Sequence, residues 1–116
     1  MMTQLDVALA YLDRCQNEML RLWETVVRLE TPGADPAAVD KLASHLDTYC
    51  NALGMETEKF RPEGAGTCLS AWTAERALSP VLLLGHMDTV HPTGSFPGGT
   101  WTVKDDGCVY GPGVHD

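Results

Sequence analysis

The sequence predicts an α/β fold in which two helices pack on a small mixed β-sheet. Two long stretches carry apolar residues every three or four positions, as one face of a helix does. A run of four consecutive apolar residues, opened by Pro80 and closed by Gly85, is typical of a strand buried on both faces. Because such strands occur in sheets that helices cover, we expect residues 80–85 to form the central strand.

The two helices are predicted at residues 3–30 and 36–53. Thr3 can cap the first helix, and an Asp-Pro step at residues 35–36 is a strong start for the second. Gly54 is suited to end the second helix, because glycine accepts the left-handed conformation that follows a C-cap. The first helix carries one apolar stripe, made up of Leu5, Ala8, Leu9, Leu12, Cys15, Met19, Leu22, Trp23, Val26 and Val27. The predicted buried face of the second helix comprises Val39, Leu42, Ala43, Leu46, Cys50 and Leu53.

The remaining strands are predicted from alternation and turn residues. Residues 55–60 read as an edge strand with charged side chains on one face, and residues 67–72 as a second strand. Near the C-terminal end, residues 100–104 and 108–110 flank an Asp-Asp-Gly sequence, which predicts a β-hairpin. We expect the central strand to pair with its neighbours in one small mixed sheet.

Composition excludes several classes of protein. A chain of 116 residues that is 44% hydrophobic and 21% charged is typical of one soluble globular domain. Its formal net charge of -8 and its lack of basic clusters argue against nucleic-acid binding. No apolar run approaches the roughly 20 residues of a membrane span. Three acidic residues near the N-terminus, Asp6, Asp13 and Glu18, are inconsistent with a signal peptide.

The four cysteines are scattered and form no Cys-x-x-Cys pair. This spacing argues against a zinc finger, and a disulfide framework would need an export signal. We therefore expect reduced thiols and a cytoplasmic protein.

A histidine and an aspartate stand at the end of the predicted central strand. In an extended segment, His86 and Asp88 project to the same side. The Asp88 carboxylate could then accept a hydrogen bond from one imidazole nitrogen and leave the other for a metal. A turn between Gly111 and Gly113 presents Asp116 as a second candidate ligand, and a carboxylate can bridge two cations. Together these residues predict half of a two-metal hydrolytic site.

The other histidines are weaker candidates. His115 adjoins Asp116, but the side chains of neighbouring residues usually diverge, so we do not expect it to bind metal. His91 is expected to be exposed or close to a substrate, and His45 to face solvent. The tryptophans are expected in the core or in an interface.

Two motifs resemble the M20 family of zinc metallopeptidases. They are residues 84–90, Leu-Gly-His-Met-Asp-Thr-Val, and residues 110–116, Tyr-Gly-Pro-Gly-Val-His-Asp. The family includes glutamate carboxypeptidase, acetylornithine deacetylase and succinyl-diaminopimelate desuccinylase. The resemblance runs from the first helix to the last residue, and the loop from Pro92 to Gly94 is most similar to the glutamate carboxypeptidase branch.

The resemblance implies the roles of three residues. His86 would ligate one zinc ion, Asp116 would bridge two, and Asp88 would be the catalytic-site aspartate that orients His86. The implied cofactor is a pair of Zn²⁺ ions, with Co²⁺ as a substitute. The implied reaction is hydrolysis of the amide bond of a small peptide or an N-acyl amino acid by a zinc-activated water.

The resemblance also implies that residues 1–116 are the N-terminal portion of an aminopeptidase-like catalytic domain. The family's general-base glutamate, its other zinc ligands and the lid domain used for homodimerisation have no match in this sequence. We therefore expect the isolated chain to be inactive. We also expect apolar surface to be exposed along the central strand and the first helix.

Two other readings stay open. The chain could be a non-catalytic module that keeps His86 and Asp116 for metal binding or partner docking, or a structural α/β domain. Within the family, the sequence leaves open whether the parent is a peptidase, a deacetylase or a desuccinylase.

Overall fold

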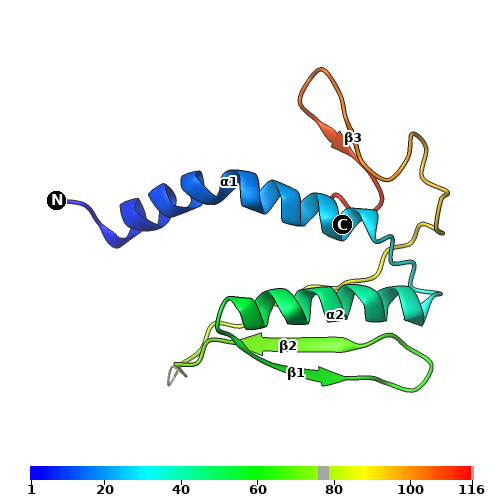
Figure 1. Ribbon diagram of the computed structural model, residues 1–116, viewed down its shortest axis with the longest axis horizontal. Helices are drawn as coiled ribbons and strands as arrows, with labels where there is room; N and C mark the ends of the chain where they lie inside the picture. The colour runs from blue at the N-terminus through cyan, green and yellow to red at the C-terminus, as the bar shows by residue number, and fades with distance from the viewer. Residues whose placement is uncertain (76–78, 116) are drawn as a thin grey trace.

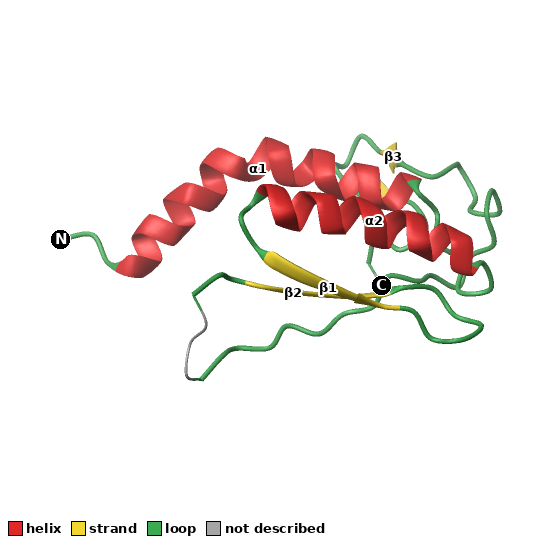
Figure 2. Ribbon diagram, turned by 60° about the horizontal axis from the view of Figure 1, so that its bottom comes forward, coloured by secondary structure: helices red, strands yellow, loops and turns green. Residues whose placement is uncertain are grey.

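The computed structural model describes residues 1–75 and 79–115 and has the predicted α/β character (Figure 1). The described residues form two helices and two antiparallel sheets of two strands each. Figure 2 shows both helices on one side of the first hairpin, with the N-terminal part of the first helix projecting beyond it. The elements are α1 (Gln4–Arg28), α2 (Pro36–Ala52), β1 (Glu56–Phe60), β2 (Cys68–Trp72), β3 (Thr102–Val103) and β4 (Val109–Tyr110).

The start of α1 confirms the predicted cap. The Thr3 hydroxyl accepts a hydrogen bond from the Asp6 amide at 3.2 Å, and the Asp6 carboxylate accepts one from the Thr3 amide at 2.8 Å. This reciprocal pair is a capping box, which satisfies amides that the first turn leaves without helical partners. The helix then runs unbroken over 25 residues to its C-cap at Leu29.

The ends of α2 are also as predicted. The Asp35 carboxylate accepts hydrogen bonds from the amides of Ala37 and Ala38 at 3.1 and 3.2 Å, and Pro36 occupies the first turn. Gly54 follows the C-cap with a φ of 78°, a conformation that side-chain-bearing residues rarely adopt. The buried apolar core is small and lies mainly on this helix: it consists of Val27, Ala38, Val39, Leu42 and Ala43.

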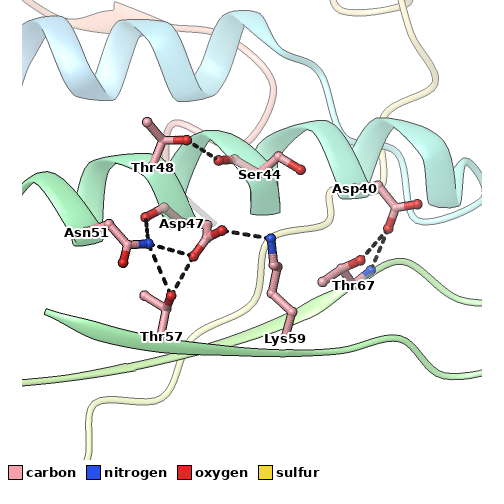
Figure 3. A network of polar contacts seen from close by, with 8 residues as sticks. All are labelled: Asp40, Ser44, Asp47, Thr48, Asn51, Thr57, Lys59 and Thr67. Atoms are coloured by element: carbon pink, nitrogen blue, oxygen red, sulfur yellow. Dashed lines mark hydrogen bonds and ion pairs between the residues drawn. The ribbon is translucent and has the colours of Figure 1, made fainter.

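The β1–β2 hairpin is anchored to α2 through two carboxylates (Figure 3). Asp47 accepts hydrogen bonds from Thr57 Oγ1 at 2.6 Å and from Lys59 Nζ at 2.7 Å. Asp40 accepts them from the hydroxyl and amide of Thr67 at 2.7 and 2.8 Å. These contacts, together with antiparallel pairing from Glu56↔Trp72 to Phe60↔Cys68, confirm the two predicted strands.

The C-terminal hairpin is present but shorter than predicted. Thr102 pairs with Tyr110 and Val103 with Val109, and Gly107 turns the chain with a φ of 81°. The hairpin rests on α1 because the rings of Trp23 and Trp101 meet edge to face, with centroids 5.0 Å apart.

The predicted central strand is absent, and that prediction was wrong. Residues 80–85 belong to no strand in the described part of the chain, and the four apolar side chains from Val81 to Leu84 are 82–90% exposed. The prediction of one mixed sheet is also wrong, because the described residues form two separate sheets and both are antiparallel. An apolar run favours burial, but a strand also needs neighbours for its backbone amides and carbonyls, and the described residues provide none there.

The expectation of exposed apolar surface is confirmed. Five large apolar side chains of α1, namely Leu5, Leu9, Leu12, Met19 and Leu20, are 43–66% exposed. The accessible surface of 8919 Å² exceeds the roughly 6,200 Å² typical of a compact chain of this mass. The radius of gyration of 16.4 Å likewise exceeds the roughly 13 Å expected for this length.

Replacing a core residue of α2 should destabilise the fold strongly. Leu42 is only 3% exposed, so Leu42→Ala removes buried methyl groups and leaves a cavity; we expect a loss of about 2–5 kcal/mol in the free energy of unfolding. Chemical denaturation followed by circular dichroism measures this loss. Leu9→Ala on α1 is the matched control, because Leu9 is 51% exposed and its loss should change stability by about 0.5 kcal/mol or less. Equal effects of the two substitutions would contradict this assignment of the core.

The two carboxylates that anchor the hairpin should make stability depend on acid pH. The Thr67 hydroxyl and Arg61 lower the pKa of Asp40, and Lys59 and Thr57 lower the pKa of Asp47. A carboxyl whose pKa is lower when folded stabilises the protein above its unfolded pKa, near 3.9 for aspartate, and loses this effect as pH falls through the folded pKa. We expect stability to fall below about pH 4 for this reason.

Thermal unfolding between acid and neutral pH tests this expectation. Asp47→Asn should flatten the acid limb of the stability profile, while Asp13→Asn, at an exposed position of α1, should leave it unchanged. If both variants lost as much stability at acid pH as the unaltered chain does, the pH dependence would come from other groups.

Candidate metal centre

The segment that carries His86 and Asp88 is held by a short parallel contact with the linker between α1 and α2. The Thr31 hydroxyl donates a hydrogen bond to the Met87 carbonyl oxygen at 2.5 Å, and the Thr89 amide donates one to the Thr31 carbonyl oxygen at 2.7 Å. The Gly33 amide then donates to the Thr89 carbonyl oxygen at 3.0 Å. Since Thr31 is only 3% exposed, the linker between α1 and α2 anchors residues 87–89 from inside the molecule. No residue pattern in the sequence indicated this role of the linker.

Within this anchored segment, Asp88 contacts the ring of His86 in two ways. His86 Nδ1 lies 2.8 Å from the Asp88 carbonyl oxygen and 3.4 Å from Asp88 Oδ1. The shorter contact makes the backbone carbonyl the acceptor for an Nδ1 proton, whereas the sequence had suggested the carboxylate. Either contact favours the tautomer protonated at Nδ1, for which Nε2 is the metal-binding nitrogen. Both side chains are more than half exposed, at 57% and 55%.

The Asp88 carboxylate lies directly against Gly33. A Cβ atom at position 33 would stand 2.8 Å from Asp88 Oδ2, closer than real Cβ contacts come. Gly33 therefore leaves the space that the carboxylate occupies. Nothing in the sequence pattern links these two positions, which are far apart in the chain.

The glycine-flanked turn passes close to the rest of the fold, as predicted. A Cβ atom at Gly111 would collide with the carbonyl oxygen of Thr100 and would lie 3.0 Å from Val27 Cγ1. Gly111 and Pro112 are buried, and Gly113 has a φ of 74°. The close approach of the backbone thus requires glycine at 111, and the left-handed conformation favours it at 113.

This turn and the histidine segment line the same hollow. A cavity of about 280 Å³ is lined by residues of both segments. They are His86, Asp88, Thr89, Val90, His91 and Phe96, together with Gly111, Gly113, Val114 and His115. The Oγ1 atom of Thr89 is buried and has no hydrogen-bond partner among the described residues. His91 packs edge to face against Phe96, with ring centroids 5.0 Å apart.

Only part of the predicted ligand set can be placed. His86, Asp88 and His115 line the hollow, whereas Asp116 lies outside the described residues. Within residues 1–75 and 79–115, no group of three or more histidine, cysteine, aspartate or glutamate side chains is arranged to hold a metal ion. The described residues therefore bring together one matched ligand and the carboxylate beside it.

The chain matches no protein-family model, no curated protein and no solved structure. Within the described residues, neither helix combines the length and the hydropathy that crossing a membrane requires.

Substitution of Gly33 should disturb the histidine site. In Gly33→Ala the new methyl group would displace the Asp88 carboxylate. Because that side chain is 55% exposed and can move, we expect a loss of about 0.5 kcal/mol or less in the free energy of unfolding. The imidazole ¹⁵N shifts of His86 should change, because the carboxylate that lies 3.4 Å from its Nδ1 atom moves. Gly85→Ala is the control: position 85 directly precedes His86, yet a Cβ there meets nothing within 4 Å. If Gly33→Ala and the unaltered chain gave the same spectra, the position of the Asp88 carboxylate would not depend on Gly33.

Proposed function

We propose that residues 1–116 are the N-terminal portion of the catalytic domain of a di-zinc M20-type amidohydrolase. The observation that carries this proposal is the shared hollow: Gly111, Gly113, Val114 and His115 line the same cavity as His86 and Asp88, although about 25 positions lie between His86 and Gly111. A turn that runs up to Asp116 thus lies beside the candidate histidine ligand.

The chemistry of these residues suits zinc. Contacts at Nδ1 direct metal binding to Nε2 of His86, and the Asp116 carboxylate is suited to bridge two cations. Asp88 is the positioning residue, because its carbonyl and carboxylate oxygens both approach the imidazole. When bound, zinc polarises a substrate carbonyl and makes its water nucleophilic at neutral pH, and Co²⁺ can take its place.

The same proposal limits what the isolated chain can do. A catalytic zinc ion normally has three protein ligands, and the two matched residues here fall short of that number. No residue matches the family's general base, so we propose that the complete enzyme supplies it. The proposed substrate is a small peptide or an N-acyl amino acid, with glutamate carboxypeptidase as the nearest type. We further propose a cytoplasmic enzyme that forms a homodimer through a lid domain.

Zinc titration of the purified chain tests the metal site. We expect Zn²⁺ binding by calorimetry that His86→Ala abolishes. Asp88→Ala should weaken it by less than the roughly 10–100-fold that loss of the partner of a ligating histidine causes, because the Asp88 carbonyl oxygen stays beside Nδ1. His115→Ala is the matched control, since His115 lines the same hollow but is not a predicted ligand, and it should leave the affinity unchanged. Zinc binding that survives His86→Ala would refute the proposed site, and no binding at any pH would favour the reading as a structural α/β domain.

Hydrolysis assays test the fragment reading separately. We expect no zinc-dependent release of an amino acid from an acyl-amino acid by the 116-residue chain, because the general base and further ligands are unmatched. Turnover that depends on added zinc would refute this expectation. A Glu-Glu pair and a later histidine in coding sequence beyond Asp116 would distinguish a catalytic fragment from a metal-binding module without activity.

A further inference from the structure

Glu30 adopts a backbone conformation that is unfavourable for glutamate. It directly follows the C-cap of α1 and has a φ of 45°, the one positive φ of a residue other than glycine among the described residues. The residue in the corresponding place after α2 is Gly54, which adopts a positive φ without a steric penalty. A side-chain-bearing residue in the left-handed region is usually held there by contacts with the surrounding structure.

The Glu30 carboxylate makes such a contact with a loop 64 residues later. Glu30 Oε1 accepts a hydrogen bond from the Gly94 amide at 2.9 Å. An ionised acceptor makes this bond stronger than one between neutral groups. Gly94 belongs to a turn in which the amide and the hydroxyl of Ser95 both donate to the Pro92 carbonyl oxygen, at 3.0 and 2.6 Å. The carboxylate therefore binds a turn that has hydrogen bonds of its own.

The linker between α1 and α2 thus holds this part of the chain at two points. Thr31 and Gly33 bind residues 87–89, and Glu30 binds the turn that follows. His91 lies between the two attachments. Because a loop held at both ends has fewer conformations than a loop held at one end, the position of His91 depends on Glu30 as well as on Thr31.

The loop carries two aromatic side chains that line the candidate site. Residues 92–95 are exposed, whereas His91 and Phe96 on either side of them are half-buried and meet edge to face. Both rings line the hollow of about 280 Å³ that His86 and Asp88 also line. His91 and Phe96 therefore form an aromatic wall beside the candidate metal ligand.

We propose that Glu30 is a positioning residue of the proposed hydrolase, whose carboxylate holds the aromatic wall where a substrate bound at the metal site would lie. An N-acyl amino acid has apolar groups that suit the Phe96 ring and oxygen atoms that suit an imidazole donor of His91. The role in substrate binding rests on the proposed function, whereas the contact between Glu30 and Gly94 requires no metal.

Substitutions at Glu30 test the positioning role. Glu30→Gly removes the carboxylate but introduces the residue that best accepts a positive φ, so α1 should stay folded, which circular dichroism checks. We expect the Gly94 amide to exchange with solvent roughly tenfold faster, since it loses its acceptor. The nuclear Overhauser contact between the rings of His91 and Phe96 should weaken.

Two further variants complete this test. Glu30→Gln keeps an acceptor oxygen at the same place and should retain most of the Gly94 protection and of the contact between the rings. Glu63→Gly removes a carboxylate from an exposed turn and is the matched control, which should change neither signal.

A substrate probe tests the aromatic wall. N-acetyl-L-glutamate added to the zinc-loaded chain should shift the ring resonances of His91 and Phe96. The shift should be smaller in Glu30→Gly than in Glu30→Gln, because the wall is then in place for less of the time. The imidazole of His45, which lies on α2 outside the hollow, should not shift.

Two results would overturn the inference. If Glu30→Gly left both the exchange of Gly94 and the contact between the rings unchanged, Glu30 would not position the loop. If the chain bound zinc but the probe left both rings unshifted, the aromatic wall would have no part in substrate binding, while the metal site would stand. A chain that binds no zinc would instead count against the proposed function, and the exchange of Gly94 would still decide the role of Glu30.

Discussion

The three hydrogen bonds between Thr31 or Gly33 and residues 87–89 are the constraint on which the candidate site depends. They join the linker between the two helices to a segment more than 50 residues later, and they do so where Thr31 is buried. Residues 79–90 belong to no helix or strand, so their position relative to α2 depends on contacts such as these. His86 and Asp88 owe their place beside the glycine-flanked turn to this contact.

The local features of the fold could be predicted because each is determined by neighbouring residues. A capping threonine, an Asp-Pro step and the glycine after α2 mark helix ends through hydrogen bonds and backbone conformations within a few positions. The first hairpin followed from alternation in the same way. Asp40 and Asp47 then fix it to α2 through contacts that the alternation did not indicate.

The long-range features could not be predicted from local pattern. The run at residues 81–84 has the composition of a buried strand, but composition does not show whether a partner edge is available, and here the described residues offer none. The contact of Gly33 with Asp88 escaped prediction as well, because a glycine in a turn-forming stretch is adequately explained by the turn. His86 and Asp88 were found from their chemistry and spacing. Their arrangement depends on the linker between α1 and α2, and no sequence motif in that linker indicates the contact.

The exposed segment and the candidate metal centre are physically linked, because only Gly85 separates Leu84 from His86. A metal site is most effective when its ligands are held by rigid elements. Among the described residues, the segment before His86 has no strand partner. The parallel contact at Thr31 fixes residues 87–89, which follow the histidine. Residues 81–84, which precede it, pair with no strand among the described residues. The sequence predicted a rigid strand under His86, and the structure supports the histidine from the C-terminal side alone.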